Sequence, residues 1–140
     1  VVVLERILRD SAAARAAQQK LEAEFSKRDR ELQDMGARLK TGAERFEKDA
    51  PVMTETDRAR RQRELAEMDR EFQRKQREFR EDFNQRRNEE LQSIIERTNR
   101  IIRQMAEQDK YDLIVQEAVY FNPRIDITEK VLRALNNGAK

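Results

Sequence analysis

The sequence predicts a mostly α-helical protein in which a long antiparallel helical hairpin, a coiled-coil arm, stands on a small β-containing body. Residues 56–108 contain no Gly or Pro, and their large apolar residues recur at three- and four-residue steps. At 1.5 Å per residue such a helix is about 80 Å long, and its narrow apolar stripe is typical of a coiled-coil seam. Short β-branched and aromatic runs at 1–4, 113–115 and 118–121 predict the strands of the body.

The composition indicates long solvated helices and disfavours a catalytic protein. Charged residues make up 41% and hydrophobic residues 37% of the 140 residues, and the mean hydropathy is −1.04. The 30 Lys and Arg nearly balance the 28 Asp and Glu, so the charge permits anionic partners without requiring them. The sequence has no His, no Cys, no Gly-rich phosphate loop and no nucleophile elbow. We therefore expect no enzyme activity, no cofactor and no metal site.

The chain is predicted to begin with a strand and one helical turn. Val1–Leu4 has the β-branched character of a buried strand, and Glu5–Arg9 forms a turn that directs Ile7 and Leu8 inward. Ser11 is expected to cap the next helix, because its hydroxyl can accept a hydrogen bond from a free backbone N–H.

The two helices of the hairpin are predicted at 12–48 and 56–108. Pro51 disfavours helical geometry at the residue before it, and Thr54 or Thr56 can cap the helix that follows. Because the break is short, the helices should fold back on each other as an antiparallel pair.

The seam residues of the two helices align if the chain reverses near residue 52, where the numbers of facing residues add up to about 104. The pairs that this predicts are Leu21 with Phe83, Phe25 with Phe79, Leu32 with Phe72 and Leu39 with Leu65. Gly36 and Gly42 each weaken the first helix by roughly 1 kcal/mol relative to Ala, so the outer half of the hairpin should be looser.

The end of the second helix is expected to enter the body, because adjacent isoleucines at 94–95 and 101–102 widen its apolar face. The strands 113–115 and 118–121 follow. Residues 126–129 resemble a capping box that opens a short helix, which ends at Asn136–Gly138. The predicted inner face of this helix consists of Val131, Leu132 and Leu135. The predicted organisation is therefore a body of 1–13 and 108–140 and an arm of 14–107 with its tip near 49–56.

The body should not be stable in a single chain. It has only about 45 residues and a few short strands, which bury too little apolar surface to fold alone. Open Val- and Ile-rich strand edges would also promote aggregation. We therefore expect chains to share the body through self-association. The residues predicted to form this oligomeric body are Val1, Val2, Val3, Leu113, Ile114, Val115, Val119 and Tyr120.

The order of these segments resembles the Skp/OmpH family of periplasmic chaperones for outer-membrane proteins. The residues that carry the resemblance are Glu5–Leu8, Tyr111–Val115, Ala118–Tyr120, Asp126–Thr128 and Val131–Leu132, with the charged hairpin between them. The resemblance implies a homotrimer with a small β-barrel base and three helical arms around a cavity. It implies that unfolded outer-membrane proteins are held there without ATP, in the periplasm, after removal of a signal peptide that this chain does not show.

The tip of the arm contains the candidate contacts for a client or an anion. Four arginines cluster there, and they have two interpretations. In the first, they pair with nearby acidic residues on a solvated helix face. In the second, they attract acidic clients, anionic lipid headgroups or lipopolysaccharide phosphate. The candidate residues are Phe46, Met53, Arg58, Arg60, Arg61 and Arg63.

A function of another class remains open from the residues. Arg-rich helices can neutralise phosphates, so the chain could be a nucleic-acid-binding protein or a purely structural coiled coil. Nucleic acid is the less favoured partner, because acidic residues interrupt the basic runs and the aromatic residues are used in the seam.

Overall fold

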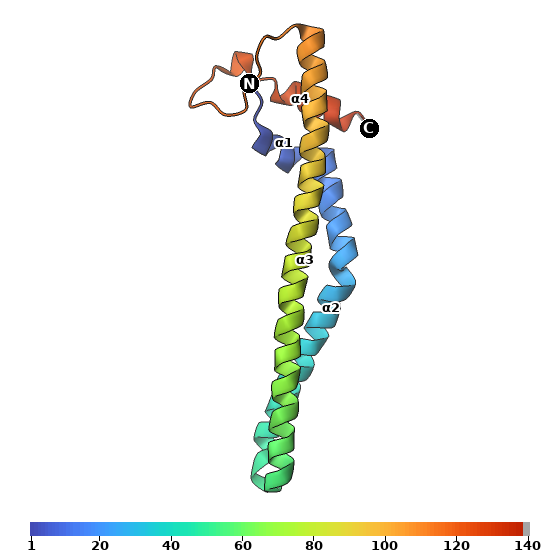
Figure 1. The fold of residues 1–140 in the computed structure, drawn as a ribbon, viewed down its shortest axis with the longest axis vertical. Helices are drawn as coiled ribbons and strands as arrows, with labels where there is room; N and C mark the ends of the chain where they lie inside the picture. The colour runs from blue at the N-terminus through green and yellow to red at the C-terminus, as the bar shows by residue number, and fades with distance from the viewer. Residues whose placement is uncertain (139–140) are drawn as a thin grey trace. The chain divides into compact units, whose positions relative to one another are not determined.

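The computed structural model describes residues 1–138, most of which are helical (Figure 1). The elements follow in the order α1 (Leu4–Asp10), α2 (Ala12–Asp49), η1 (Ala50–Val52), α3 (Glu55–Asp109), η2 (Pro123–Ile125) and α4 (Thr128–Asn136), where η1 and η2 are 3₁₀ helices. The bounds of α2 and α3 confirm the two long helices that the sequence predicts.

The described chain divides into two compact units. The basal unit comprises Val1–Glu22 and the described chain from Gln85 onward, and the hairpin unit comprises Ala23–Asn84. The sequence predicts a body of 1–13 and 108–140, which associates with other chains, and an arm of 14–107, which binds the client. This division stays a prediction.

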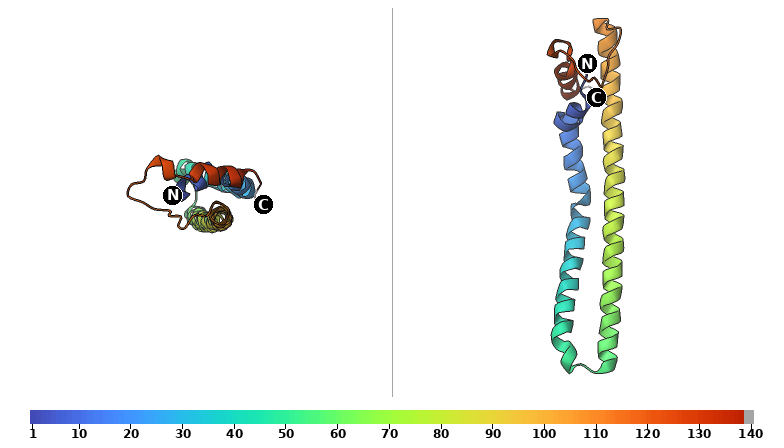
Figure 2. Two further views of the ribbon diagram at one scale, coloured as in Figure 1. Left: turned by 90° about the horizontal axis from the view of Figure 1, so that it is seen from above. Right: turned by 90° about the vertical axis from the view of Figure 1, so that its left-hand side faces the viewer.

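In the hairpin unit, α2 and α3 run antiparallel, and η1 reverses the chain between them (Figures 1 and 2). The predicted pairing of Phe25 with Phe79 is confirmed, since their ring centroids lie 5.5 Å apart in an edge-to-face arrangement. Phe83 makes a second edge contact with Phe25 at 5.4 Å. The guanidinium of Arg28 lies 5.4 Å from the Phe25 ring centroid and 3.0 Å from the Asp82 carboxylate. This aromatic cluster fixes the register at one end of the unit.

Nearer the turn, the facing residues are three or four positions beyond the predicted ones. A Cβ atom added at Gly36 would lie 3.3 Å from Phe72 Cζ, and one at Gly42 would lie 2.9 Å from Leu65 Cδ2. Phe72 and Leu65 therefore reach Gly36 and Gly42, beyond their predicted partners. The reason is that η1 carries the first helix on to Val52, so the reversal is centred after residue 52.

The turn is closed by hydrogen bonds that come mainly from one arginine. Arg58 donates from Nε and Nη2 to the Ala50 carbonyl oxygen at 3.2 and 2.9 Å, and from Nη2 to the Met53 carbonyl oxygen at 3.2 Å. The Thr54 hydroxyl oxygen accepts from the Asp57 N–H at 3.2 Å, which confirms Thr54 as the cap of α3. Arg58 thus donates hydrogen bonds to backbone carbonyl groups that have no partner within an α-helix, because the chain reverses there.

Replacing Arg58 with Gln is expected to destabilise the turn by about 1–3 kcal/mol, because carbonyl groups of Ala50 and Met53 lose a charged donor. Urea unfolding and hydrogen exchange at η1 measure the effect. The matched control is Arg60→Gln, since Arg60 makes only a solvent-exposed ion pair with Asp57 at 3.4 Å and should change stability by less than about 0.5 kcal/mol. Equal losses in the two variants would contradict the structural role of Arg58.

The core of the basal unit joins both ends of the chain to the end of α3. Its buried residues come from the start of the chain, including α1, and from α3 and α4. They are Val2, Ile7, Ile101, Met105, Val131, Leu132 and Leu135. The predicted inner face of the last helix and the predicted inward position of Ile7 are therefore confirmed. The widened face of α3 is also buried at Ile94 and Thr98, as expected for a helix that packs against more than one neighbour.

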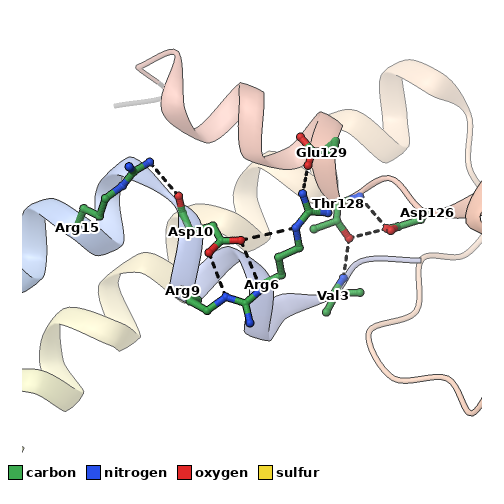
Figure 3. Close-up of polar contacts among 8 residues, drawn as sticks. All are labelled: Val3, Arg6, Arg9, Asp10, Arg15, Asp126, Thr128 and Glu129. Carbon is green, nitrogen blue, oxygen red and sulfur yellow. Dashed lines mark hydrogen bonds and ion pairs between the residues drawn. The ribbon is translucent and has the colours of Figure 1, made fainter.

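Side-chain hydrogen bonds lie near the starts of α2 and α4. The Ser11 hydroxyl oxygen accepts from the Ala14 N–H at 3.0 Å, which confirms the predicted cap of α2. Asp126 accepts from the N–H and the hydroxyl of Thr128 at 3.0 and 2.5 Å, and the Thr128 hydroxyl oxygen accepts from the Val3 N–H at 2.9 Å (Figure 3). A short polar network therefore ties the first residues of the chain to the start of α4.

Residues 126–129 do not form the complete capping box that the sequence predicts. Glu129 forms an ion pair with Arg6 of α1 (Figure 3). The Asp126 N–H donates instead to the Pro123 carbonyl oxygen at 3.1 Å. The ion pair with Glu129 joins α1 to α4, and Arg6 also lies 3.7 Å from Asp10 within α1. An ion pair between two helices has therefore replaced the local hydrogen bond expected of Glu129.

The strands predicted at 1–4, 113–115 and 118–121 do not form, and residues 1–138 contain no β-strand. Leu4 instead begins α1. Three backbone bonds to the first two residues remain, from the Val2 N–H to the Val115 oxygen and from the Ile127 N–H to the Val1 oxygen, both at 2.9 Å, and from the Val1 amino group to the Ile125 oxygen at 2.8 Å. A strand requires repeated pairing with a neighbour, and one chain provides these extended segments with too few partners.

Candidate functional site

The tip arginines carry less uncompensated charge than their number suggests. Arg58 is occupied by the backbone of the turn, and Arg60 pairs with Asp57. Arg61 lies 3.8 Å from the Glu64 carboxylate, whereas Arg63 is exposed and has no ion pair within the described chain. This arrangement supports the interpretation of a paired, solvated helix face over that of a strongly electropositive tip.

Phe46 and Met53, the apolar candidates near the tip, are half-buried. Val52 beside them in η1 is 87% exposed, although the sequence did not single it out. Their role as client contacts stays a prediction.

The predicted body residues fall into two groups. Val1, Val2, Val3, Ile114 and Val115 are buried or half-buried. In contrast, Leu113 is 78% exposed, Tyr120 is 80% exposed and Val119 is fully exposed. The segment 111–121, called here the apolar loop, also includes Tyr111 and Phe121. Several large apolar side chains exposed in one loop indicate an interaction surface, whereas single exposed apolar residues are common on any protein.

An ion-pair cluster joins α2 and α3 within the basal unit. Lys20 and Arg86 donate to the Glu90 carboxylate at 3.1 and 3.0 Å, and these hydrogen bonds hold the pKa of Glu90 below its usual value. Since the folded state favours the ionised form, this contribution to stability is present above the unfolded pKa of about 4.3 and is lost as the pH falls below it.

The hairpin unit contains a groove between α2 and α3 that sequence reasoning missed. The groove, called here the Gly42 groove, has a volume of about 430 Å³ and is partly open to solvent. Its floor is formed by Ala37, Gly42, Leu65 and Met68, and its rim carries Arg38, Arg45, Arg61 and Glu64. The signal was Gly42 at a seam position, where the missing side chain allows Leu65 Cδ2 to lie 2.9 Å from the place of a Cβ atom.

Among residues 1–138, no group of three or more acidic residues is arranged to hold a metal ion. No helix in the described part of the chain has both the length and the apolar character required to cross a bilayer.

These features define a protein of the helical-hairpin class, whose exposed candidate surfaces are a groove along the hairpin and an apolar loop on the basal unit. The sequence profile of the family OmpH, described as outer membrane protein (OmpH-like), matches residues 1–135. The chain therefore belongs to the OmpH-like family.

Relatives with assigned names agree with this membership. Chaperone protein Skp of Yersinia enterocolitica is 27% identical over 135 residues, which cover 95% of this chain and 82% of that protein. Chaperone protein Skp of Vibrio cholerae is 25% identical over 119 residues, which cover 84% and 70%. Both relatives are named as chaperones.

The fold is also that of a solved structure. An OmpH-like outer membrane chaperone from Caulobacter crescentus superposes with a TM-score of 0.81 over 95% of this chain and 80% of its own, at 18% sequence identity. This similarity confirms the helical-hairpin fold that the sequence predicts.

Proposed function

We propose that this protein is an ATP-independent holdase chaperone of the periplasm, which holds unfolded outer-membrane β-barrel proteins between the helical arms of a homotrimer. Membership of the OmpH-like family supports the chaperone class and favours it over a nucleic-acid-binding protein or a purely structural rod. Family membership supports the chaperone class alone. Our proposal adds the trimer, the enclosure of the client and the independence from ATP.

The observation that carries the proposal is the apolar loop. Leu113, Val119 and Tyr120 expose their side chains, while the adjoining Val2 N–H already pairs with the Val115 oxygen. Association of several chains would bury these side chains and extend the isolated backbone bond into a shared sheet. In this way the chains complete together the small β-barrel base that a single chain lacks, and each chain contributes its hairpin as an arm.

The mechanism is confinement with many weak contacts. A client held by scattered charges and occasional apolar groups stays mobile, and its unpaired strand edges cannot reach other client chains. Release requires a better competing site, such as insertion machinery or a membrane, rather than nucleotide hydrolysis.

The test is aggregation of a porin that is diluted from urea, followed by light scattering. The protein is expected to suppress scattering at about one trimer per porin without added nucleotide, because enclosure requires one assembly per client. The control is an equal mass of a coiled-coil protein that has no chaperone function. Unchanged scattering at equimolar trimer would refute the holdase proposal.

A further inference from the structure

The Gly42 groove combines an apolar floor with unpaired positive charge. A Cβ atom at Gly42 would lie 2.9 Å from Leu65 Cδ2, so glycine at this position allows the Leu65 side chain to pack against the backbone of α2 and form part of the floor. Arg38 and Arg45 on the rim are exposed and make no ion pair within the described residues. Arg61 is shared with Glu64 at 3.8 Å. The rim therefore has more positive than negative charge beside a hollow with apolar residues in its floor.

We propose that the Gly42 groove binds a segment of unfolded polypeptide in which an apolar side chain stands next to an Asp or Glu. This inference rests on the proposed holdase function and names the client feature that this part of the arm selects. The apolar side chain lies against Leu65, Met68 and Gly42, and the carboxylate pairs with Arg38 or Arg45.

The size and charge of the groove favour this occupant. A volume of about 430 Å³ accommodates a few side chains, and it lies in the range of pockets that bind small groups. Two flexible arginines at an exposed rim attract a carboxylate without fixing its geometry, so each contact is weak and reversible. Weak binding suits a client that must remain mobile and leave without ATP.

The binding test uses the full-length protein and three fluorescein-labelled Gly/Ser peptides with a central Phe-Asp-Phe, Phe-Asn-Phe or Gly-Asp-Gly sequence. Fluorescence anisotropy is expected to give affinities about fivefold or more higher for Phe-Asp-Phe than for either other peptide, a difference of ~1 kcal/mol. Equal affinity for the Asp and Asn peptides would overturn the carboxylate assignment.

Two pairs of variants locate the binding. Arg38→Gln with Arg45→Gln should reduce the preference for Asp over Asn to below about twofold, because the rim charge is removed. The control, Arg30→Gln with Arg70→Gln, changes the net charge equally at exposed positions outside the groove and should leave the preference intact. Equal effects of the two double variants would contradict a local site.

The second pair tests the floor. Gly42→Leu should displace Leu65 from the floor and weaken binding of both Phe peptides by about fivefold or more. The control, Gly36→Leu on the same helix, gains similar helix propensity outside this groove. Circular dichroism establishes that both variants fold. If Gly42→Leu folds and binds normally, or if dodecyl phosphate micelles bind at the groove while the peptides do not, the proposal is wrong.

The same variants separate this proposal from the holdase proposal. A folded Gly42→Leu protein that still suppresses porin aggregation but loses the peptide preference supports a groove that selects among clients. Failure of the unsubstituted protein to suppress aggregation refutes the holdase function alone, because peptide binding is measured independently.

Discussion

Replacing Leu113 and Val119 together with Asp is expected to convert the protein from an oligomer into single chains of 16.7 kDa. Both side chains are largely exposed in one chain, and neither belongs to the core of the basal unit. The substitutions should therefore leave the fold of the chain intact while placing two charges where the proposed assembly buries apolar side chains, which is strongly unfavourable without partners. Sedimentation equilibrium at several concentrations measures the change.

The matched control is Val52→Asp. Val52 is 87% exposed, as apolar as Val119, and lies in η1 of the hairpin unit rather than in the apolar loop. It should leave the oligomeric state unchanged. The account of assembly would fail if the Leu113→Asp, Val119→Asp protein kept its oligomeric mass, or if Val52→Asp dissociated the assembly to the same degree.

Replacing Leu135 with Ala is expected to lower the free energy of unfolding by about 2–4 kcal/mol, because it removes a buried side chain and leaves a cavity. Leu135 is 2% exposed and belongs to the core that joins α4 to the end of α3 and to α1. Since oligomer stability depends on concentration, urea unfolding of all variants is compared at one protein concentration.

Val52→Ala is the control for this second prediction, because it also shortens an aliphatic side chain but at an exposed position. It should change stability by less than about 0.5 kcal/mol. A loss in Leu135→Ala as small as that of the control would show that α4 does not contribute to the core in solution.

The long helices could be predicted closely because local chemistry decides them. Pro51 ends the first helix, Thr54 caps the next one, and the stretch between Glu55 and Asp109 has no Gly or Pro to interrupt it. The pairing of Phe25 with Phe79 followed from the seam pattern. The register nearer the turn did not follow, because it depends on the 3₁₀ helix η1, whose residues carry no distinct pattern.

The strands were mispredicted for a physical reason that bears on function. Segments 113–115 and 118–121 have the composition of strands, but strand formation requires neighbours that one chain does not contain. Composition therefore indicated what these residues are suited to form, and the structure of one chain leaves Leu113, Val119 and Tyr120 exposed.

The candidate site was predicted unevenly. The sequence drew attention to the tip arginines by their clustering, but only the structure shows that Arg58 is bound to the backbone of the turn. It also reveals that Gly42 and Arg45 share a groove with residues of α3, a contact that depends on register and so could not be read from spacing.

Native mass spectrometry with and without one unfolded porin tests the central claim most directly. The account predicts three chains of 16.7 kDa, about 50 kDa in all, and a second species heavier by a single porin. A single chain of 16.7 kDa that leaves the porin free to aggregate would contradict it.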